Sequence, residues 1–157
     1  MNIEIDVVTR PLTDAEAVVV RYLYRQLAPT EKLSLYEMRF SAKPPQAIIL
    51  ARWPQTRCIM GMVFFAPYYR DVHEWGYIWN LIIHRCSRRK GIGSHLVSKA
   101  VELTRQADKR HLLAKTDTPE GRQFFATIGF VPGDAFHRER FRDAHLPVRG
   151  NELFLPT

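Results

Sequence analysis

The sequence predicts a mixed α/β domain in which helices cover both faces of a central sheet. Apolar residues recur with helical spacing in some segments and alternate with polar residues in others, and the two kinds of segment are interspersed along the chain. The strand predicted at 76–83 is apolar on both of its faces, so the sheet needs a covering layer on each side. The 157 residues are enough for a core of their own, and we expect a single domain over 1–157.

The N-terminal part predicts one strand and then two helices. Residues 3–10 alternate between apolar and polar side chains, which is typical of a strand. Residues 13–27 predict a helix that Thr13 caps and Pro29 ends. Residues 31–40, "EKLSLYEMRF", predict a second, short helix, which must end before the Lys-Pro-Pro sequence that follows.

Three strands are then predicted in succession, at 46–53, 58–69 and 76–83. The connections between them, "PQTR" and "RDVHE", are short, so these strands should form antiparallel hairpins. Strict alternation along the third strand would divide its apolar side chains between two faces. One face would carry Tyr77, Trp79, Leu81 and Ile83, and the other would carry Ile78 and Ile82.

The C-terminal half alternates between helix and strand. Residues 91–107 predict an amphipathic helix, 111–115 a short strand and 118–130 another helix. Beyond them, 135–141 and 152–155 have the pattern of strands. The apolar stripe of the first helix consists of Ile92, Leu96, Ala100 and Leu103. No repeat or linker interrupts the series, which agrees with one domain.

The composition narrows the classes of function. A net charge of +7 suits an anionic partner, either nucleic acid or a phosphorylated small molecule. The longest apolar runs are far shorter than the ~20 residues of a membrane-spanning helix, and the N-terminus lacks the basic region of a signal peptide. The two cysteines, Cys58 and Cys86, match neither a disulfide framework nor a metal-ligand spacing. We therefore expect a cytoplasmic protein without membrane contact and without a metal.

A phosphate site is predicted where the strand at 76–83 leads into the next helix. In "SRRKGIGSHL" (87–96), three cations precede a Gly-x-Gly pair, and an amphipathic helix starts directly behind it. The first N–H groups of a helix are unpaired and lie at the positive end of its dipole, and Gly91 and Gly93 have no Cβ to keep a phosphate away. A dinucleotide fingerprint would need a third glycine in place of Leu96, and the spacing of a P-loop is absent too.

Two sequence blocks resemble the GNAT superfamily of N-acetyltransferases. "RRKGIG" (88–93) matches the acetyl-CoA-binding motif [Q/R]-x-x-G-x-[G/A], and "GRQFFATIGF" (121–130) resembles the later helix of the family. With one strand between the blocks, the resemblance covers about 76–130. It implies the GNAT fold, a central, mostly antiparallel mixed sheet with helices on both faces, and acetyl-CoA as the cosubstrate.

The resemblance also implies how acetyl-CoA is held. Backbone N–H groups from Arg89 to Ser94 would hold the pyrophosphate, and the end of the strand at 76–83 would pair with the pantetheine arm as if the arm were a neighbouring strand. This pairing requires that the strand diverge from the one at 111–115. The residues that the resemblance assigns to the cosubstrate are Leu81, Ile82, Ile83, Arg88, Arg89, Lys90, Gly91, Ile92, Gly93, Ser94, Thr118 and Phe125.

The catalytic end departs from the family pattern. Many members have a tyrosine that protonates the leaving thiolate, and the matching residue here is Phe125. An asparagine often found earlier in that helix falls near Thr118, and a glutamate that some members use as a base falls at Tyr77. We therefore expect the proton from water or from another hydroxyl, with Tyr77 as the first choice. Glu74 and His84 are the first candidates for a base that acts through water.

Other polar clusters have both a functional and a structural interpretation. Three titratable residues share the turn before the strand at 76–83: Asp71, His73 and Glu74. They could form a base or part of a metal site, or simply a solvated hairpin turn. Glu31 and Glu37 lie on the segment that borders the acceptor pocket in the family, where they could attract an amine or be exposed helix residues. "HRERFRDAH" (137–145) fits a nucleic-acid patch or a charged edge strand.

Together these observations predict an N-acetyltransferase that moves acetyl from acetyl-CoA to a primary amine, by direct transfer in a ternary complex. The acceptor would be a small molecule or a peptide, and a homodimer stays open. One alternative is a GNAT-fold protein that binds acyl-CoA and has weak or lost transferase activity, which Phe125 motivates. A second is a basic nucleic-acid-binding module, although we do not expect nucleic acid as the partner.

Overall fold

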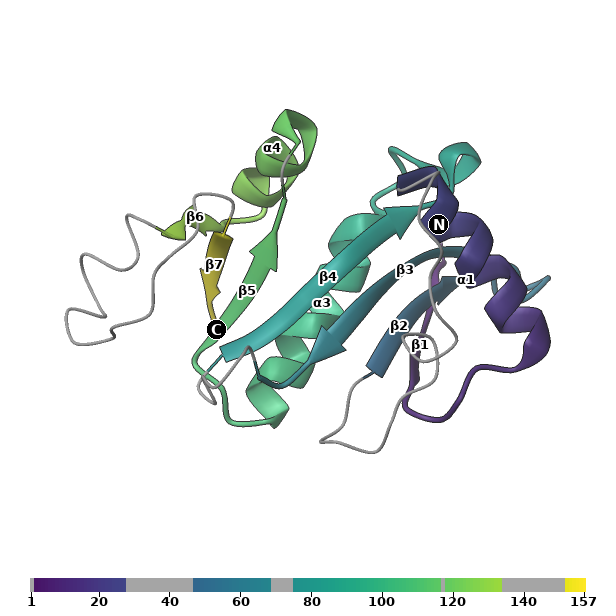
Figure 1. Ribbon diagram of the computed structural model, residues 1–157, viewed down its shortest axis with the longest axis horizontal. Helices are drawn as coiled ribbons and strands as arrows, with labels where there is room; N and C mark the ends of the chain where they lie inside the picture. Colours follow the sequence, from purple (N-terminus) through teal and green to yellow (C-terminus); the bar gives the residue numbers. More distant parts are fainter. Residues whose placement is uncertain (1, 28–46, 69–74, 117, 134–151) are drawn as a thin grey trace.

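A computed structural model describes residues 2–27, 47–68, 75–116, 118–133 and 152–157. In that part of the chain, the strands form one sheet in the order β1-β2-β3-β4-β5-β7-β6 (Figure 1). The strands are β1 (Glu4–Val8), β2 (Ala47–Arg52), β3 (Ile59–Ala66), β4 (Trp75–Ile83), β5 (His111–Lys115), β6 (Val131–Pro132) and β7 (Glu152–Pro156). The helices are α1 (Asp14–Leu27), the 3₁₀ turn η1 (Arg85–Ser87), α3 (Ile92–Gln106) and α4 (Pro119–Thr127).

The predicted elements that fall within the described residues are present, with ends that differ by a few residues at most. The turn η1 and the short strand β6 were not predicted. Neither has a periodic apolar pattern, because each is too short to show one. The helix predicted at 31–40 and the strand-like segment at 135–141 lie outside the described residues.

The sheet is mixed and mostly antiparallel, as predicted. Strands β1 to β4 pair in sequence as antiparallel neighbours, and β7 pairs antiparallel with both β5 and β6. The parallel pair in the described sheet is β4 and β5, and α3 lies between them in the sequence. A parallel pair needs such a crossover, because the second strand must start at the same edge of the sheet as the first.

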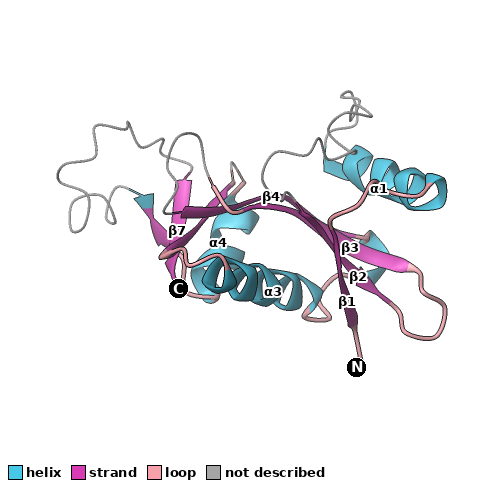
Figure 2. Cartoon of the chain, turned by 90° about the horizontal axis from the view of Figure 1, so that it is seen from below, coloured by secondary structure: helices cyan, strands magenta, loops and turns pink. Residues whose placement is uncertain are grey.

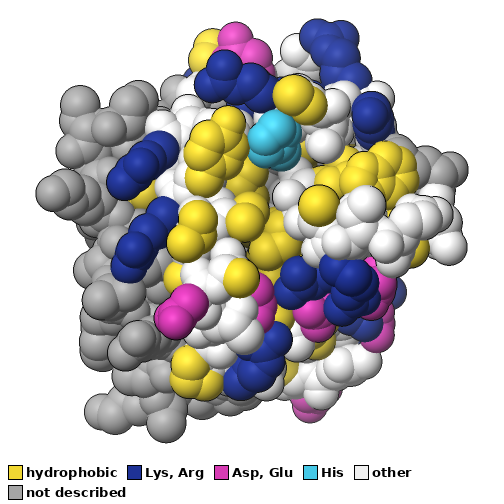
Figure 3. Space-filling model, turned by 90° about the vertical axis from the view of Figure 1, so that its right-hand side faces the viewer, with side chains coloured by type: hydrophobic (Ala, Val, Ile, Leu, Met, Phe, Trp, Pro, Cys, Tyr) yellow, Lys and Arg dark blue, Asp and Glu magenta, His cyan; other side chains and the backbone are white. Residues whose placement is uncertain are grey.

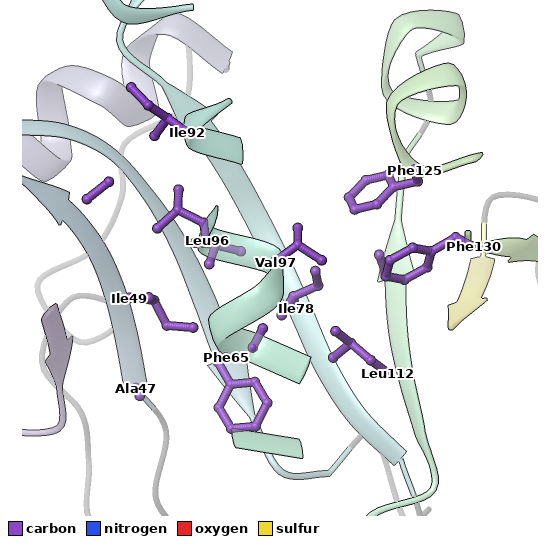
Figure 4. Packing of buried hydrophobic residues seen from close by; sticks show 14 of the residues in the cluster. Ala47, Ile49, Phe65, Ile78, Ile92, Leu96, Val97, Leu112, Phe125 and Phe130 are labelled. Atoms are coloured by element: carbon purple, nitrogen blue, oxygen red, sulfur yellow. The ribbon is translucent and has the colours of Figure 1, made fainter. Parts of the chain in front are cut away.

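Helices cover both faces of the sheet, which confirms the prediction from the apolar strand β4. Helix α1 lies on one face, and α3 and α4 lie on the other (Figure 2). Neighbouring residues of β2 serve the two sides, since Ile48 belongs to the cluster with Leu23 of α1 and Ile49 to the cluster with Leu96 of α3 (Figure 4). The two layers bury β2 along its whole length and β3 after its first residue, whereas β4 has both buried and half-buried residues.

A β-bulge interrupts β4 after Trp79. Asn80 has a φ of +53°, a left-handed value that is uncommon for residues other than glycine. Phe64 of β3 lies opposite Trp79, whereas Met62 lies opposite Ile82, so β4 holds one residue more than β3 between these pairs. Such an extra residue is the defining feature of a bulge, and it changes the direction of the residues that follow.

The alternation predicted along β4 is therefore wrong beyond the bulge. Trp79 and Ile82 pack with the apolar cluster beneath α1. Ile78, Leu81 and Ile83 pack with the cluster beneath α3. The prediction assumed an unbroken pleat, and one inserted residue exchanges the faces of the residues after it.

A polar cluster joins α1 to the first two strands. Arg52 of β2 is 8% exposed, and it donates to Oδ2 of Asp6 at 3.1 Å and to Oε2 of Glu16 at 3.3 Å. Glu16 also pairs with Arg10 at 3.0 Å, and its backbone N–H donates to the hydroxyl of the cap residue Thr13 at 3.2 Å. Burial raises the pKa of Glu16, but the hydrogen bonds from Arg10 and Thr13 outweigh burial and hold this pKa below its ordinary value.

Candidate functional site

A cleft opens where β4 and β5 separate (Figure 1). The two strands pair from Trp75–His111 to Ile78–Ala114, and β4 then continues to Ile83 without β5 beside it. The divergence that the resemblance requires is thus present. It leaves one edge of β4 with backbone N–H and C=O groups that have no strand partner, and such groups seek hydrogen bonds.

The cleft has a volume of about 740 Å³ and collects residues from distant parts of the chain. Its walls are the second half of β4, the start of α3, the segment from β5 into α4, and the last turn of α1. The three β4 residues that sequence analysis assigned to the cosubstrate, Leu81 to Ile83, all line it. The volume lies in the ordinary range of small-molecule sites.

The bulge in β4 lies on the wall of this cleft. Asn80 and Leu81 both line the cleft, and they lie between the Trp79 and Ile82 pairs, where β3 has only Val63. The extra residue of a bulge is left out of the strand ladder, and bulges are frequent beside active sites. Backbone groups at this point are therefore available to a bound molecule.

The predicted phosphate loop has left-handed backbone conformations at two positions. The φ angles of Arg89 and Gly91 are 60° and 75°. Gly91 caps α3, and no acidic residue lies in the first turn of the helix. The N-terminal N–H groups of α3 are therefore free of a competing carboxylate from that turn, which favours an anion.

The remaining loop residues differ in exposure. Arg89, Lys90 and Gly91 are exposed, and Ser94 is half-buried. Ile92 is 1% exposed and belongs to the core, so only its backbone can serve a ligand. The loop is braced, because Nε of Arg88 donates to the carbonyl of Ile83 at 3.3 Å and the ring of His95 contacts the carbonyl of Gly91 at 2.8 Å.

Glycine is favoured at the two motif positions, Gly91 and Gly93, for different structural reasons. A Cβ at Gly93 would lie 3.0 Å from Cζ of Phe124, so this glycine lets α4 approach α3. A Cβ at Gly91 would meet little more than the ring of His95 at 3.9 Å, and there the positive φ favours glycine. Sequence analysis explained both glycines by the access of a phosphate to the backbone, and it did not predict that Gly93 lies against Phe124.

Phe125 lies at the cleft and in the core at once. Its side chain is 5% exposed, and it packs edge-to-face with Phe124 at 5.2 Å and with Phe130 at 4.9 Å between ring centroids (Figure 4). It also contributes to the wall of the cleft. The position that the family resemblance matched to a tyrosine thus holds an apolar ring that has no proton to give.

Thr118 caps α4. Its hydroxyl accepts a hydrogen bond from the backbone N–H of Gly121 at 3.1 Å, and Thr116 lies next to it with 3.4 Å between the two hydroxyl oxygens. All three residues line the cleft. The hydroxyl of Thr118 therefore has a structural task beside any contact with the cosubstrate.

The structure brings one of the three catalytic candidates to the cleft. Tyr77 lines it, and its ring stacks on Trp79 at 4.8 Å between centroids, with Nζ of Lys115 at 5.8 Å from the centroid of Tyr77. His84 is not among the described residues that line the cleft. Its Nδ1 accepts a hydrogen bond from the backbone N–H of Cys86 at 3.2 Å. Glu74 lies outside the described residues.

Sequence analysis missed several residues of the cleft. Gln26, Lys115 and Glu120 line it although none belongs to a motif. Gln26 is far from the loop in the sequence, and only the packing of α1 on the sheet brings the two together. A helical or strand pattern predicts which face a residue takes, but it does not predict which distant segment will lie opposite.

The described residues show neither a metal site nor a membrane helix. Among them, no group of three His, Cys, Asp or Glu side chains could hold a metal ion, and no helix is long and apolar enough to cross a membrane. On the face shown in Figure 3, Lys and Arg side chains lie in separate groups with apolar side chains between them. This face does not carry one continuous basic patch of the kind that nucleic-acid binding uses.

Comparison with known proteins agrees with this geometry. N-alpha-acetyltransferase 30 from Xenopus laevis is 30% identical over 118 residues, which are 73% of this chain and 42% of that protein. The chain therefore spans less than half the length of this curated relative.

Solved structures share the fold. The tandem GNAT protein from the clavulanic acid biosynthesis pathway matches with a TM-score of 0.69 and 21% identity, over 85% of this chain and 45% of that one. Rv2747 from Mycobacterium tuberculosis, in complex with CoA and NLQ, matches with a TM-score of 0.66 and 16% identity, over 97% and 99% of the two chains. At these identities the likeness concerns the fold.

The family follows from the sequence. Residues 16–130 match the family model described as "Acetyltransferase (GNAT) family". This range includes the loop that precedes α3, the diverging strands β4 and β5, and the cleft between them. The chain belongs to the GNAT family of acetyltransferases.

Proposed function

We propose that this protein transfers an acetyl group from acetyl-CoA to a primary amine, by direct transfer in a ternary complex. One observation carries the proposal: the open edge of β4 and the N-terminus of α3 border the same cleft. A pyrophosphate and an extended amide-containing arm can therefore be held by adjacent backbone groups. The match to the GNAT family supports the same activity.

The residues at the cleft fit acetyl-CoA. The pyrophosphate would lie on the N–H groups of residues 89–94, with the guanidinium of Arg88 beside it. The pantetheine arm would lie along Leu81 to Ile83 and pair with the free edge of β4, as an added strand does. Phe125 and Gly93 would border this path, and Thr118 would border it from the start of α4.

The acetyl group enters as a thioester, whose carbonyl becomes more negative as an amine attacks it. Backbone N–H groups at the bulge, near Asn80 and Leu81, would donate to that oxygen in this proposal, because the bulge leaves them out of the strand ladder and they line the cleft. Donors that are fixed before the reaction stabilise the developing charge without reorganisation. Together with the positioning of both reactants, they supply the main rate enhancement in this proposal.

Among the described residues, the cleft has no obvious general acid or general base for the proton transfers of this reaction. The amine forms a C–N bond as the C–S bond breaks, so the amine loses a proton and the thiolate gains one. Phe125 offers no proton, and Tyr77 or water would protonate the thiolate. A water relay would remove the proton of the amine, with Glu74 and His84 as the first bases to test. Nε2 of His84 would have to serve, because Nδ1 accepts from the backbone N–H of Cys86.

The acceptor class to test first is a peptide α-amine, because the relative from Xenopus laevis is named an N-alpha-acetyltransferase. Small-molecule amines come next. One observation favours a second function: the buried Phe125 removes the usual acid, which fits a protein that binds acyl-CoA and transfers it poorly.

The test combines calorimetry and turnover. Acetyl-CoA should bind with a Kd on the order of micromolar. A panel of peptides with free α-amines, polyamines and amino sugars should then give release of free thiol with at least one acceptor. Binding without turnover on the whole panel would favour the second function. Absence of acetyl-CoA binding would overturn both.

A further inference from the structure

Gln26 carries a polar group at the cleft that nothing in the described structure explains. It lies in the last turn of α1 and lines the same cleft as Arg88 and Phe125. Both Nε2 and Oε1 of its side-chain amide are buried, and neither has a hydrogen-bond partner in the part of the chain that the structure describes. α1 reaches this place from the face of the sheet opposite α3 (Figure 2).

An amide in this state destabilises the free protein. Folding removes its hydrogen bonds to water and gives none in return, and native proteins pair the large majority of such buried groups. A methionine at this position would fill a similar volume without that loss. The partner that the described residues do not supply can come from a molecule that enters the cleft.

The chemistry of the side chain defines that partner. A primary amide presents N–H donors and a carbonyl acceptor next to each other. Two successive secondary amides can pair with both atoms, because the C=O of one accepts from Nε2 while the N–H of the next donates to Oε1. Within a single trans amide these two groups point in opposite directions. A carboxylate could pair only with Nε2 and an ammonium only with Oε1, so each would leave one atom of Gln26 without a partner.

We propose that Gln26 binds two successive secondary amides of a molecule held in the cleft. The inference rests on the proposed function, which brings two such molecules to this place. The pantetheine arm of CoA contains two secondary amides in succession, and a peptide acceptor has a series of them after its α-amine. The chemistry is the same in both cases, and the experiment separates the two sources.

The test variant is Gln26→Met, which keeps the length of the side chain and removes both polar atoms. The control is Gln106→Met on α3, the same chemical change at an exposed residue whose amide donates to Glu102 at 3.0 Å. Because Gln26 has no partner among the described residues, Gln26→Met should unfold at the same temperature as the wild type or slightly above it. A marked fall in its unfolding temperature would contradict the inference, since it would show that the amide supports the fold.

Ligand binding then identifies the source of the amides. If the arm of CoA supplies them, Gln26→Met should bind CoA about tenfold more weakly, and its Kd for adenosine 3′,5′-bisphosphate, which lacks the arm, should stay the same. If the acceptor supplies them, both Kd values should stay the same. The KM for a tetrapeptide with a free α-amine should then rise about tenfold, and the KM for butylamine should not change.

Failure of this inference differs from failure of the proposed function. The inference is overturned if the wild type binds CoA, Gln26→Met binds it with the same Kd, and the reaction with the tetrapeptide does not reveal a difference either. That last condition is met if the KM for the tetrapeptide is the same in both proteins, or if neither protein acetylates it. The proposed function is overturned instead if the wild type itself does not bind CoA. Gln106→Met should match the wild type in every binding and kinetic measurement.

Discussion

The two ends of the cleft differ in how the chain builds them. At the α3 end, one continuous stretch, residues 88–94, supplies the loop, the left-handed turns and the helix start. At the other end, single side chains arrive from separate elements: Gln26 from α1, Tyr77 from β4, Lys115 from β5 and Phe125 from α4. The first end offers mainly backbone groups to a ligand, and the second offers side chains.

This difference has a physical consequence. Backbone N–H groups are the same whatever the side chains are, so a phosphate site needs only the right turns and a helix start. A proton donor or a specificity contact depends on one side chain at one place, and each such residue can change without disturbing the fold. The α3 end should therefore be sensitive to backbone changes, and the opposite end to the loss of single functional groups.

The largest effect is expected at Gly91. Gly91→Val forces a β-branched residue to a φ of 75°, and the loop should rotate its N–H groups away from the pyrophosphate. The loss of charge-assisted hydrogen bonds should weaken acetyl-CoA binding about a hundredfold or more by calorimetry. Gly93→Val should weaken binding as well, but it also collides with Phe124, so it does not separate binding from packing.

The control for Gly91 is another left-handed glycine. Gly129 has a φ of 102°, ends α4 and is not among the described residues that line the cleft. Gly129→Val should lower the unfolding temperature and leave the Kd for acetyl-CoA unchanged in the protein that remains folded. Near-normal affinity in Gly91→Val would remove the basis of the phosphate site. Arg85→Ala, outside the motif, should have a smaller effect than Gly91→Val.

The second effect concerns the missing acid. Phe125→Tyr should raise kcat about tenfold, which is less than the usual 10²–10⁴-fold of general acid catalysis because the new hydroxyl must first reach the cleft from a core position. The Kd for acetyl-CoA should change little. Phe130→Tyr is the matched control, since Phe130 packs against Phe125 but is not among the described residues that line the cleft.

If Phe125→Tyr does not raise kcat, a mechanism through an acylated Cys86 is the alternative to direct transfer. If Phe125→Tyr is no faster with a true acceptor, and Cys86→Ala abolishes turnover with acetyl-CoA binding intact, direct transfer is the wrong mechanism. The structure argues against that outcome. Cys86 is exposed in η1, next to the phosphate loop rather than beside the bulge of β4.

A smaller effect is expected at Tyr77. Tyr77→Phe keeps the ring that stacks on Trp79 and removes the hydroxyl. We expect kcat to fall about fivefold with no change in the Kd for acetyl-CoA, because water can still deliver the proton. Tyr22→Phe is the control, because it removes an exposed hydroxyl on α1 and keeps the ring that stacks on His84 at 5.7 Å between centroids, so kcat should not change. An unchanged kcat in Tyr77→Phe would assign the proton to water alone.

The same contrast explains what the sequence could predict. The turn and the helix start at residues 88–94 were predictable because the cations, the glycines and the helix behind them are adjacent, and each has a local physical meaning. Phosphate binding by this loop stays a prediction. The pairing of β4 with β5 was predictable in outline from the family resemblance. The bulge at Asn80 was not, because an asparagine with a φ of +53° leaves no mark on the apolar pattern before it.

Contacts between distant segments were the other gap. Gly93 and Phe124 lie on different helices, and nothing in either segment indicates that a Cβ at 93 would meet that ring. Gln26 reads as an ordinary polar residue of an amphipathic helix, and only its burial in the folded chain sets it apart. Side-chain chemistry that depends on tertiary packing needs the structure, whereas chemistry of a continuous loop does not.

The smallest effect is expected at Glu16, at the start of α1, and it concerns the free energy of unfolding. The buried Arg52 pairs with Glu16 at 3.3 Å, and the pKa of Glu16 is below its ordinary value of 4.5 because hydrogen bonds from Arg10 and Thr13 outweigh burial. A carboxyl group whose pKa falls on folding stabilises the protein above its unfolded pKa, and this stabilisation is lost as the pH falls through the folded pKa. The free energy of unfolding should therefore decline as the pH is lowered below about 5.

Glu16→Gln separates this contribution from the cleft. The variant should lose about 1 kcal/mol of unfolding free energy at pH 7, and its stability should fall less steeply than that of the wild type below pH 5, measured by urea unfolding across the pH range. Glu102→Gln, which removes an exposed pair with Lys99, should reproduce the wild-type profile. Because the cluster lies at the start of α1 and the cleft meets only its last turn, acetyl-CoA affinity should stay unchanged in both variants. A weaker affinity in Glu16→Gln alone would mean that the cluster sets the position of α1 against the cleft, and that the side-chain end of the site depends on the strands β1 and β2 as well.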